Sequence, residues 1–194
     1  MFILASSSST RKSLLENAGL HFKIIKPSVN ESLLHQSHAQ LSPIALALKL
    51  ASEKTRSISR QHENQIIVGV DQVLHLENQI FHKPNNLNEA QEMLSILRGK
   101  THFLTTAISC SMNGREIWNY FDQAKMTMRH FSNSFLESYL KQNNDKNFAS
   151  VGAYQLELLG VQLFEKIEGD YFTILGFPLI EFLKFLRSKA ILET

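Results

Sequence analysis

An uninterrupted apolar run, Ile66 to Val70, restricts how this chain can fold more than any other feature of its sequence. Such a run is typical of a strand buried on both faces, because a strand with one wet face alternates apolar and polar residues. Asp71 follows directly, which predicts a carboxylate at the carboxyl end of this strand. Ligands of open α/β sheets bind at that end. The sequence therefore predicts an α/β fold with a site near Asp71.

The amino-terminal segment predicts a strand, a turn and a helix in succession. Phe2 to Ala5 is a short apolar run, and apolar residues recur at helical spacing from Thr10 until Gly19, a residue type that commonly ends helices. Between them, Ser6 to Lys12 combine hydroxyls with two cations at a helix start, which suits the phosphates of a nucleotide. A serine-rich cap on a solvated helix explains this segment equally well when it is taken alone.

The rest of the pattern alternates strands and helices, so we expect a mixed, twisted sheet flanked by helices. Asn113-Gly114 is a strong hairpin signal between two long strand-like segments, residues 101–112 and 115–130. Further strands are expected at residues 22–26, 72–76, 79–82, 161–167 and 171–175, helices at 42–58, 86–98, from 134 and from 178, and a long loop at 27–41. No linker or internal repeat divides the chain, so we expect a single domain over residues 1–194.

Composition excludes several classes of function. The 20 Lys and Arg residues are scattered and nearly balanced by 18 Asp and Glu, so we expect no nucleic-acid partner. A single cysteine, Cys110, excludes an internal disulfide and a Cys-rich zinc site, which favours a cytoplasmic location. The opening residues predict no export signal, and the apolar stretches fall short of the ~20 residues that span a bilayer. We therefore expect a soluble protein with no membrane partner.

Other nucleotide and metal motifs are absent or misplaced. Gly99-Lys100-Thr101 matches the end of a phosphate-binding P-loop, but Leu94 stands where that motif requires glycine. These residues also follow a predicted helix and enter a strand, the reverse of the order that a P-loop needs. The chain has neither a GxGxxG dinucleotide motif nor an HExxH zinc motif, and we expect His35 and His38 on the surface of a loop.

Two carboxylates and two lysines are candidates for chemistry. Asp71, at the end of a buried strand, can hold Mg²⁺ or act as a general base on water, although a capping aspartate in a tight turn is the slightly favoured interpretation when this residue is taken alone. Glu31 can bring a second carboxylate to the same place. Taken alone, Lys54 and Lys83 are ordinary surface lysines, but Lys83 precedes Pro84, and a rigid exit from a strand can orient a side chain.

The order of these pieces resembles the Maf family of nucleoside triphosphate pyrophosphatases over nearly the whole chain. Several short motifs in register carry the resemblance: Ile3-Leu4-Ala5-Ser6-Ser7-Ser8 with Arg11-Lys12 and Leu14-Leu15, Val29-Asn30-Glu31, Glu53-Lys54, Gly69-Val70-Asp71-Gln72-Val73, His82-Lys83-Pro84, Gly99-Lys100-Thr101-His102, Val151-Gly152-Ala153-Tyr154, and Glu168-Gly169-Asp170-Tyr171 before Gly176-Phe177-Pro178-Leu179. In this family Gly99-Lys100-Thr101 corresponds to a helix-to-strand connection, not a phosphate loop.

The resemblance implies two lobes around a nucleotide cleft and cleavage of a nucleoside triphosphate between its α and β phosphates. It also implies a divalent metal, Mg²⁺ or Mn²⁺, a house-cleaning role, and a homodimer, since family members are often dimers. The resemblance also implies that Asp71 is the proton acceptor and that it organises metal and water together with Glu31. The residues that would contact the triphosphate are Ser6, Ser8, Arg11, Lys54 and Lys83.

The base that the resemblance implies depends on three positions, Thr10, Gln72 and Glu157. The family's best-known branch, which prefers dTTP and UTP, has Arg, Thr and Gln there. Gln72 and Glu157 are similar to the other branch, which is associated with 7-methyl-GTP and usually has a bulky aromatic residue where Thr10 stands. A carboxylate can accept hydrogen bonds from guanine and favours a cationic methylated ring, so we expect a preference for 7-methyl-GTP.

Three alternatives stay open at this point. One is a pyrophosphatase that prefers dTTP or UTP. The neighbouring inosine triphosphate pyrophosphatases share the reaction, but their amino-terminal Thr-x-Asn-x-x-Lys signature is missing here. A different class is a non-catalytic nucleotide-binding regulator of cell division, suggested by the family's association with septum formation. The presence of Asp71, Arg11, Lys54 and Lys83 favours catalysis.

Overall fold

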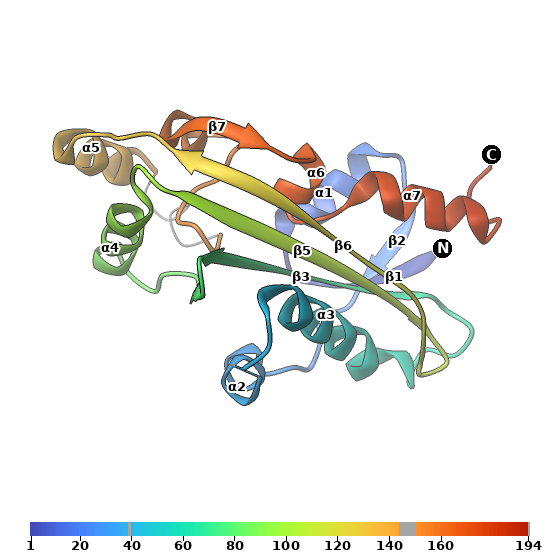
Figure 1. Cartoon of the computed structure of the whole chain (residues 1–194). Coiled ribbons are helices and arrows are strands. Elements are labelled where there is room, and N and C mark those ends of the chain that lie inside the picture. Colours follow the sequence, from blue (N-terminus) through green and yellow to red (C-terminus); the bar gives the residue numbers. More distant parts are fainter. Residues whose placement is uncertain (39, 144–149, 194) are drawn as a thin grey trace.

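The computed structural model describes residues 1–38, 40–143 and 150–193, which form an α/β structure around one mixed sheet (Figure 1). Within these residues the sheet has seven strands in the order β2-β1-β3-β5-β6-β7, with β4 paired to β3. Strands β1, β2 and β3 are parallel to one another, and the other pairings are antiparallel. The strands are β1 (Phe2–Ala5), β2 (Phe22–Ile24), β3 (Ile67–Leu76), β4 (Gln79–Phe81), β5 (Thr101–Met112), β6 (Arg115–Met128) and β7 (Phe164–Glu168).

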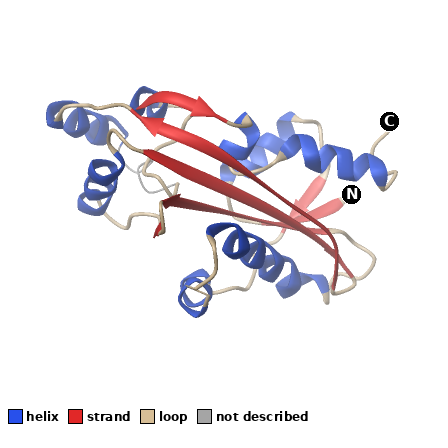
Figure 2. Ribbon diagram, in the orientation of Figure 1, coloured by secondary structure: helices blue, strands red, loops and turns tan. Residues whose placement is uncertain are grey.

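Helices cover both faces of the sheet (Figure 2). Helix α3 (Pro43–Ser59), capped by Ser42, packs on one face against β3 and β5. On the other face α1 (Ser9–Asn17) and α7 (Leu179–Ser188) bury Leu15 and Phe182 against Val68. The remaining helices are α2 (Glu31–Ser37), α4 (Leu87–Leu97), α5 (Asn133–Asn143), the short 3-10 helix η2 (Leu159–Leu163) and α6 (Tyr171–Ile174).

The long β5–β6 hairpin connects two lobes, each with its own apolar core. One core lies among α4, α5 and the nearby ends of β5 and β6, and includes Leu97, Met126 and Leu136. The other lies among β1, β3, α1 and α7. The predicted Asn113-Gly114 turn is confirmed, because both residues have the positive φ angles, 51° and 76°, that a tight hairpin turn requires. The predicted mixed sheet and two-lobed arrangement are therefore correct.

Strand β3 is longer than the sequence predicted, and Asp71 lies inside it. The prediction ended this strand at Asp71 because the apolar run stops there, but β5 pairs with β3 from Ile67 to His75. The parallel partner β1 does end early, with Ala5 opposite Gly69. Asp71 therefore lies beyond the end of β1, while its own strand continues along β5.

Three local predictions were wrong because short helices replaced the expected structure. Residues 171–175 begin with helix α6 rather than a strand, since the Asp170 side chain accepts from the backbone N–H of Thr173. The expected loop at 27–41 contains α2, capped by Asn30. The expected strand at 161–167 begins within η2 and becomes β7 only at Phe164. The sequence also indicates a polar loop after the helix that was expected to begin at Ser134, which is α5. Part of that loop, residues 144–149, lies outside the described residues.

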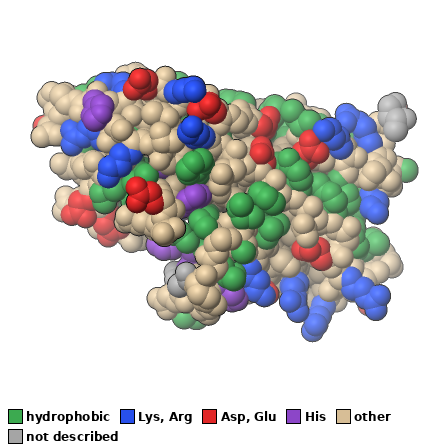
Figure 3. Space-filling model, in the orientation of Figure 1, with side chains coloured by type: hydrophobic (Ala, Val, Ile, Leu, Met, Phe, Trp, Pro, Cys, Tyr) green, Lys and Arg blue, Asp and Glu red, His purple; other side chains and the backbone are tan. Residues whose placement is uncertain are grey.

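The surface carries charges of both signs. On the face in Figure 3, acidic and basic side chains occur together with apolar ones, as the near balance of Lys and Arg with Asp and Glu predicts. Among the described residues, no helix is long and apolar enough to cross a membrane.

We expect Gly69→Ala to destabilise the fold, because α3 crosses β3 at this glycine. A Cβ here would lie 2.3 Å from the Ala51 carbonyl oxygen and 2.8 Å from a Thr55 methyl carbon. The helix would have to move off the strand, at about 1–3 kcal/mol of unfolding free energy in urea denaturation. Gly19→Asn is the matched control, since a Cβ at Gly19 would meet no atom within 4 Å and asparagine tolerates positive φ. An equal loss in both variants would contradict close packing at Gly69.

Candidate active site

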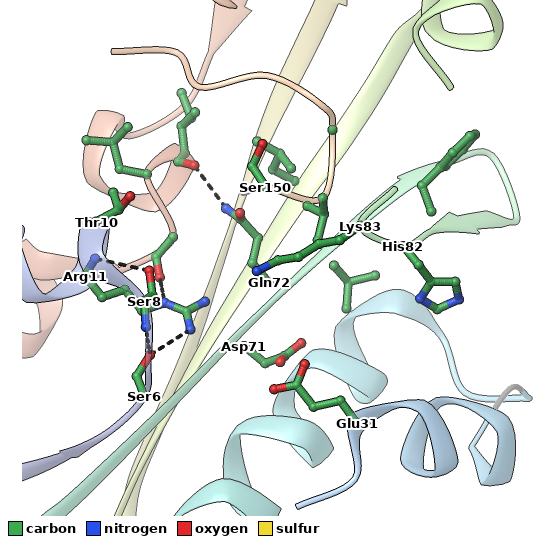
Figure 4. A pocket seen from close by; sticks show the side chains of 18 of the residues that line it. Ser6, Ser8, Thr10, Arg11, Glu31, Asp71, Gln72, His82, Lys83 and Ser150 are labelled. Carbon is green, nitrogen blue, oxygen red and sulfur yellow. Dashed lines mark hydrogen bonds between the residues drawn. The ribbon is translucent and has the colours of Figure 1, made fainter. Parts of the chain in front are cut away.

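A cleft of about 1010 Å³ lies where β1 ends, between the two lobes. It is lined by the turn after β1, by α2, α3 and β3, by the segment after β4, and by residues 150–157 and 174–176. Figure 4 shows the Asp71 and Glu31 carboxylates facing each other in this cleft, with Ser6, Ser8 and Arg11 to one side and His82 to the other. Every candidate residue from the sequence lines it: Ser6, Ser8, Thr10, Arg11, Glu31, Lys54, Asp71, Gln72, Lys83 and Glu157.

The amino-terminal turn is organised by serine hydroxyls. The Ser8 side chain caps α1 by accepting from the backbone N–H of Arg11 at 3.4 Å. Ser6, which is buried, accepts from the backbone N–H of Ser8 at 3.2 Å. A serine cap of α1 was one of the two interpretations of this segment. The cap is present, and it lies at the edge of the cleft rather than on a solvated surface.

Arg11 connects three segments that are distant in the sequence. Its Nε donates to the Gly176 carbonyl at 2.8 Å, and its Nη1 donates to the Val70 carbonyl at 3.0 Å. The Val70 carbonyl is available because β1 ends at Ala5, opposite Gly69. Burial lowers the pKa of Arg11, and the opposing charges of Asp71 and Glu31 limit that fall. The guanidinium is therefore a fixed cation rather than a mobile surface group.

Lys54 is buried between two carboxylates. Its ammonium lies 2.6 Å from Asp71 Oδ1 and 2.9 Å from Glu31 Oε1, and it also donates to the Val70 carbonyl at 3.4 Å. Lys54 and Asp71 are each only 5% exposed, whereas the Glu31 side chain is 56% exposed. The expectation that Lys54 is an ordinary surface lysine when taken alone does not hold, because α3 directs it onto β3.

Glu31 stays ionised at this site. Partial burial opposes its ionisation, but the charge and hydrogen bond of Lys54, with Lys83 and Arg11, outweigh that effect and lower the pKa of Glu31. Its carboxylate and that of Asp71 converge on one ammonium, so their oxygens lie close together. Two such hard oxygen donors suit Mg²⁺ or Mn²⁺. Within the described residues no group of three or more His, Cys, Asp or Glu could hold a metal ion.

Lys83 reaches into the cleft from the segment after β4 (Figure 4). Partial desolvation, followed by the charge of Arg11, lowers the pKa of Lys83. The described cleft therefore gathers the cations Arg11, Lys54 and Lys83 around the carboxylates Glu31 and Asp71. This excess of positive charge favours a polyanionic ligand.

Gln72 is fixed by a polar network on the face of β3 opposite Asp71. Its Nε2 donates to Thr106 Oγ1 at 2.9 Å and to the carbonyls of Thr173 and Ile174, each at 3.1 Å. Thr106 in turn donates to the Thr173 carbonyl at 2.8 Å. Because carbonyl oxygens only accept, the amide nitrogen must face them, and Oε1 is the atom left for a ligand. Thr10 is half-buried and Glu157 is exposed in the same cleft.

Sequence reasoning missed two histidines of the cleft. His35 was expected on a loop surface together with His38, but it lies on α2 and lines the cleft with His82. His38 does lie outside the cleft lining, at the end of α2. Burial, and then His82, lower the pKa of His35. The one available signal was spacing, since His35 follows Glu31 by one helical turn once α2 is recognised as a helix.

Comparison with known proteins identifies the family. The profile described as Maf-like protein matches residues 1–189. The chain belongs to the Maf family. It is 43% identical over 191 residues to a nucleoside triphosphate pyrophosphatase of Nitrobacter hamburgensis, covering 98% of this chain and 95% of that protein. It is 40% identical over 195 residues to a 7-methyl-GTP pyrophosphatase of Rhizobium meliloti, covering 100% and 98%.

A more distant likeness exists among solved structures. A HAM1 protein from Coxiella burnetii aligns with a TM-score of 0.47 at 15% identity, covering 66% of this chain and 73% of that chain. The assignment to the Maf family rests on the sequence matches. In this family member Gly99 joins α4 to β5 with a φ of 68°, and the Gly99-Lys100-Thr101 segment lies outside the cleft lining, so it is not a phosphate loop.

We expect His102, in the Gly-Lys-Thr-His motif, to make stability depend on pH. Its ring is fully buried and its Nε2 lies 2.8 Å from the Tyr154 hydroxyl, on the segment that carries Glu157. Burial lowers the pKa of His102 to about 3. Since an unfolded histidine has a pKa of about 6.5, the unfolded state binds the extra proton between these values, and stability falls as pH decreases through that window.

The test compares urea denaturation of the wild type and His102→Gln at pH 7, 6 and 5. As the pH is lowered, the unfolding free energy of the wild type should fall more steeply than that of His102→Gln. The difference should reach up to about 1.4 kcal/mol per pH unit below the pKa of an unfolded histidine. His21→Gln, which alters an exposed ring, should keep the wild-type slope. Identical slopes in wild type and His102→Gln would show that His102 does not titrate in this way.

Proposed function

We propose that this protein hydrolyses a nucleoside triphosphate between its α and β phosphates, releasing a nucleoside monophosphate and pyrophosphate. The observation that carries the proposal is the ion cluster in the cleft, where Lys54 joins Asp71 and Glu31 within reach of Arg11 and Lys83. Relatives that cover nearly the whole chain bear the names nucleoside triphosphate pyrophosphatase and 7-methyl-GTP pyrophosphatase. The family and the charges of the cleft therefore support the same reaction.

In the proposed mechanism Asp71 is the general base. A water oxygen attacks the α phosphorus, its proton passes to an Asp71 carboxylate oxygen, and the bond from the α phosphorus to the bridging oxygen breaks. The electron pair leaves with pyrophosphate. Lys54 holds Asp71 Oδ1 at 2.6 Å, which leaves Oδ2 for the water. Arg11 and Lys83 stabilise the charge that develops on the phosphates, and the Ser6 and Ser8 hydroxyls line their path.

Asp71 and Glu31 would also hold a divalent metal, Mg²⁺ or Mn²⁺. Such an ion, when bound, neutralises phosphate charge and lowers the pKa of coordinated water. Few protein ligands suit Mg²⁺, which retains several waters and binds substrate phosphates. Lys54 orients both carboxylates for this purpose from its buried position.

For the base, we propose that the cleft prefers 7-methylguanine. Gln72 offers only Oε1 because its amide nitrogen is bonded to Thr106 and to backbone carbonyls. Glu157 also offers only acceptor atoms when ionised. Guanine presents an N1–H and an amine along one edge, and N7 methylation adds positive charge that a carboxylate attracts. Thr10, smaller than an arginine, leaves space beside them.

The role of Asp71 predicts that Asp71→Asn lowers kcat by about 100-fold or more, because general base catalysis is lost. Release of pyrophosphate from 7-methyl-GTP with Mg²⁺ or Mn²⁺ is the measurement. Glu53→Gln is the control, since Glu53 neighbours Lys54 on α3 but pairs with Lys49 at 2.8 Å and lies outside the cleft lining. Wild-type turnover in Asp71→Asn would disprove the proposed base. No turnover of any triphosphate by the wild type would favour a binding regulator.

The base preference predicts that Glu157→Gln shifts selection away from 7-methyl-GTP. The ratio of kcat/KM for 7-methyl-GTP to that for dTTP should fall about tenfold, because one charged hydrogen bond is lost. A panel of 7-methyl-GTP, GTP, dTTP and UTP measures this ratio. Glu165→Gln on β7 removes the same charge outside the cleft lining and should leave the ratio unchanged. A wild-type preference for dTTP would refute the proposed specificity.

A further inference from the structure

A row of three polar residues crosses the sheet on the face that α6 contacts. Gln72 on β3 pairs directly with Thr106 on β5, and Thr106 pairs with Asp122 on β6. Gln72 and Asp122 are half-buried, and Thr106 is fully buried. Polar groups in such positions are costly unless they are hydrogen-bonded. The bonds of this row therefore show which groups it holds in place.

Helix α6 is tied to this row through Thr173, which is fully buried. Thr173 Oγ1 donates to Asp122 Oδ2 at 2.7 Å, and Thr106 Oγ1 donates to the Thr173 carbonyl at 2.8 Å. The Asp170 side chain caps the same helix by accepting from the backbone N–H of Thr173 at 2.9 Å. The carbonyls at the end of α6 are therefore fixed relative to β5.

The Thr106 hydroxyl constrains which atom of Gln72 can face it. Its one proton is donated to the Thr173 carbonyl, so Oγ1 offers only lone pairs to Gln72. Gln72 Nε2 donates to that oxygen at 2.9 Å, and to the Thr173 and Ile174 carbonyls at 3.1 Å each. Gln72 lines the cleft (Figure 4), whereas Thr106 lies outside the cleft lining. Thr106 can therefore influence a ligand only through Gln72.

We propose that Thr106 is a positioning residue for base selection, because it holds the Gln72 amide with Oε1 towards the base. This inference rests on the proposed function, since it takes the base to lie against Gln72. Guanine presents an N–H and an amine that suit an acceptor, whereas thymine flanks its one N–H with two carbonyl oxygens, which suit an amide N–H. A Gln72 amide that was free to turn over would serve either base. The fixed orientation therefore favours guanine.

The next residue of β5 supplies a matched control, because it makes the same kind of bond on the other face of the sheet. Thr105 is also fully buried, and its Oγ1 accepts from Gln123 Nε2 at 2.9 Å. Neither Thr105 nor Gln123 is part of the cleft lining. Thr105→Val therefore removes the same hydroxyl group and the same type of hydrogen bond as Thr106→Val, away from Gln72.

The test measures kcat/KM for 7-methyl-GTP and for dTTP in wild type, Thr106→Val, Thr106→Ser and Thr105→Val. In Thr106→Val the ratio of the two values should fall about fivefold, because a neutral hydrogen bond to Gln72 is lost, and the change should lie in KM rather than kcat. Thr106→Ser keeps the hydroxyl and should keep the wild-type ratio. Thr105→Val should lose a similar amount of unfolding free energy in urea but leave the ratio unchanged.

A double-mutant cycle tests whether Thr106 acts through Gln72. In a Gln72→Met background, which lacks the amide, Thr106→Val should change the ratio no further. A further fall there, a wild-type ratio in Thr106→Val, the same fall in Thr106→Ser, or an equal fall in Thr105→Val would each overturn the inference. If Thr106→Val does not fold, Thr106→Ala removes the same hydroxyl without adding a methyl group and decides the same question.

Calorimetric titrations of 7-methyl-GMP and dTMP separate this inference from the proposed reaction. The ratio of their affinities should fall in Thr106→Val as the ratio of kcat/KM does. Equal affinity ratios in wild type and Thr106→Val would overturn the inference and leave the proposed reaction in place. Failure of the wild type to cleave any triphosphate would instead refute the proposed function, and the titrations would still decide the role of Thr106.

Discussion

The site depends on the ion pairs that the buried Lys54 ammonium makes with Asp71 and Glu31. A charge that is 5% exposed is costly to bury, and here Asp71, Glu31 and the Val70 carbonyl compensate it from three directions. Loss of one partner of a buried pair typically costs about 3–5 kcal/mol, because the other charge stays behind. The same contacts hold α2, α3 and β3 together. The charges that the proposed chemistry uses are therefore also structural.

The early end of β1 explains why these charges gather where they do. Beyond Ala5 the edge of β3 has lost its parallel neighbour, and the Val70 carbonyl accepts from Arg11 on α1 and from Lys54 on α3. One free backbone acceptor thus draws cations from helices on both faces of the sheet. Arg11 also reaches the Gly176 carbonyl, where the positive φ of 92° suits glycine, so the turn between α6 and α7 is tied to α1.

Local patterns predicted the parts of the fold that local forces decide. The buried run before Asp71, the Ser42 cap of α3 and the Asn113-Gly114 turn are each set by neighbouring residues, and each prediction was correct in kind. The length of β3 was not predictable in this way, because β5, distant in the sequence, continues the pairing past Asp71. The same limit explains the missed pairing of His35 with His82. Their contact depends on α2 folding back against the segment after β4, which no short pattern encodes.

The pleat of β3 places the proposed catalytic residue Asp71 and the proposed base-selecting residue Gln72 on opposite faces of the strand, although both line the same cleft. Successive side chains of a strand point to opposite faces, so Asp71 meets Lys54 on the α3 side while Gln72 meets Thr106 and α6 on the other. Because β1 ends here, the cleft reaches both faces around the open edge of the strand. A change at Gln72 therefore alters the wall that we propose faces the base, and it leaves the Lys54–Asp71 contact in place. If the proposed roles hold, the nucleotide preference can change through Gln72 while the proposed hydrolytic centre at Asp71 is kept.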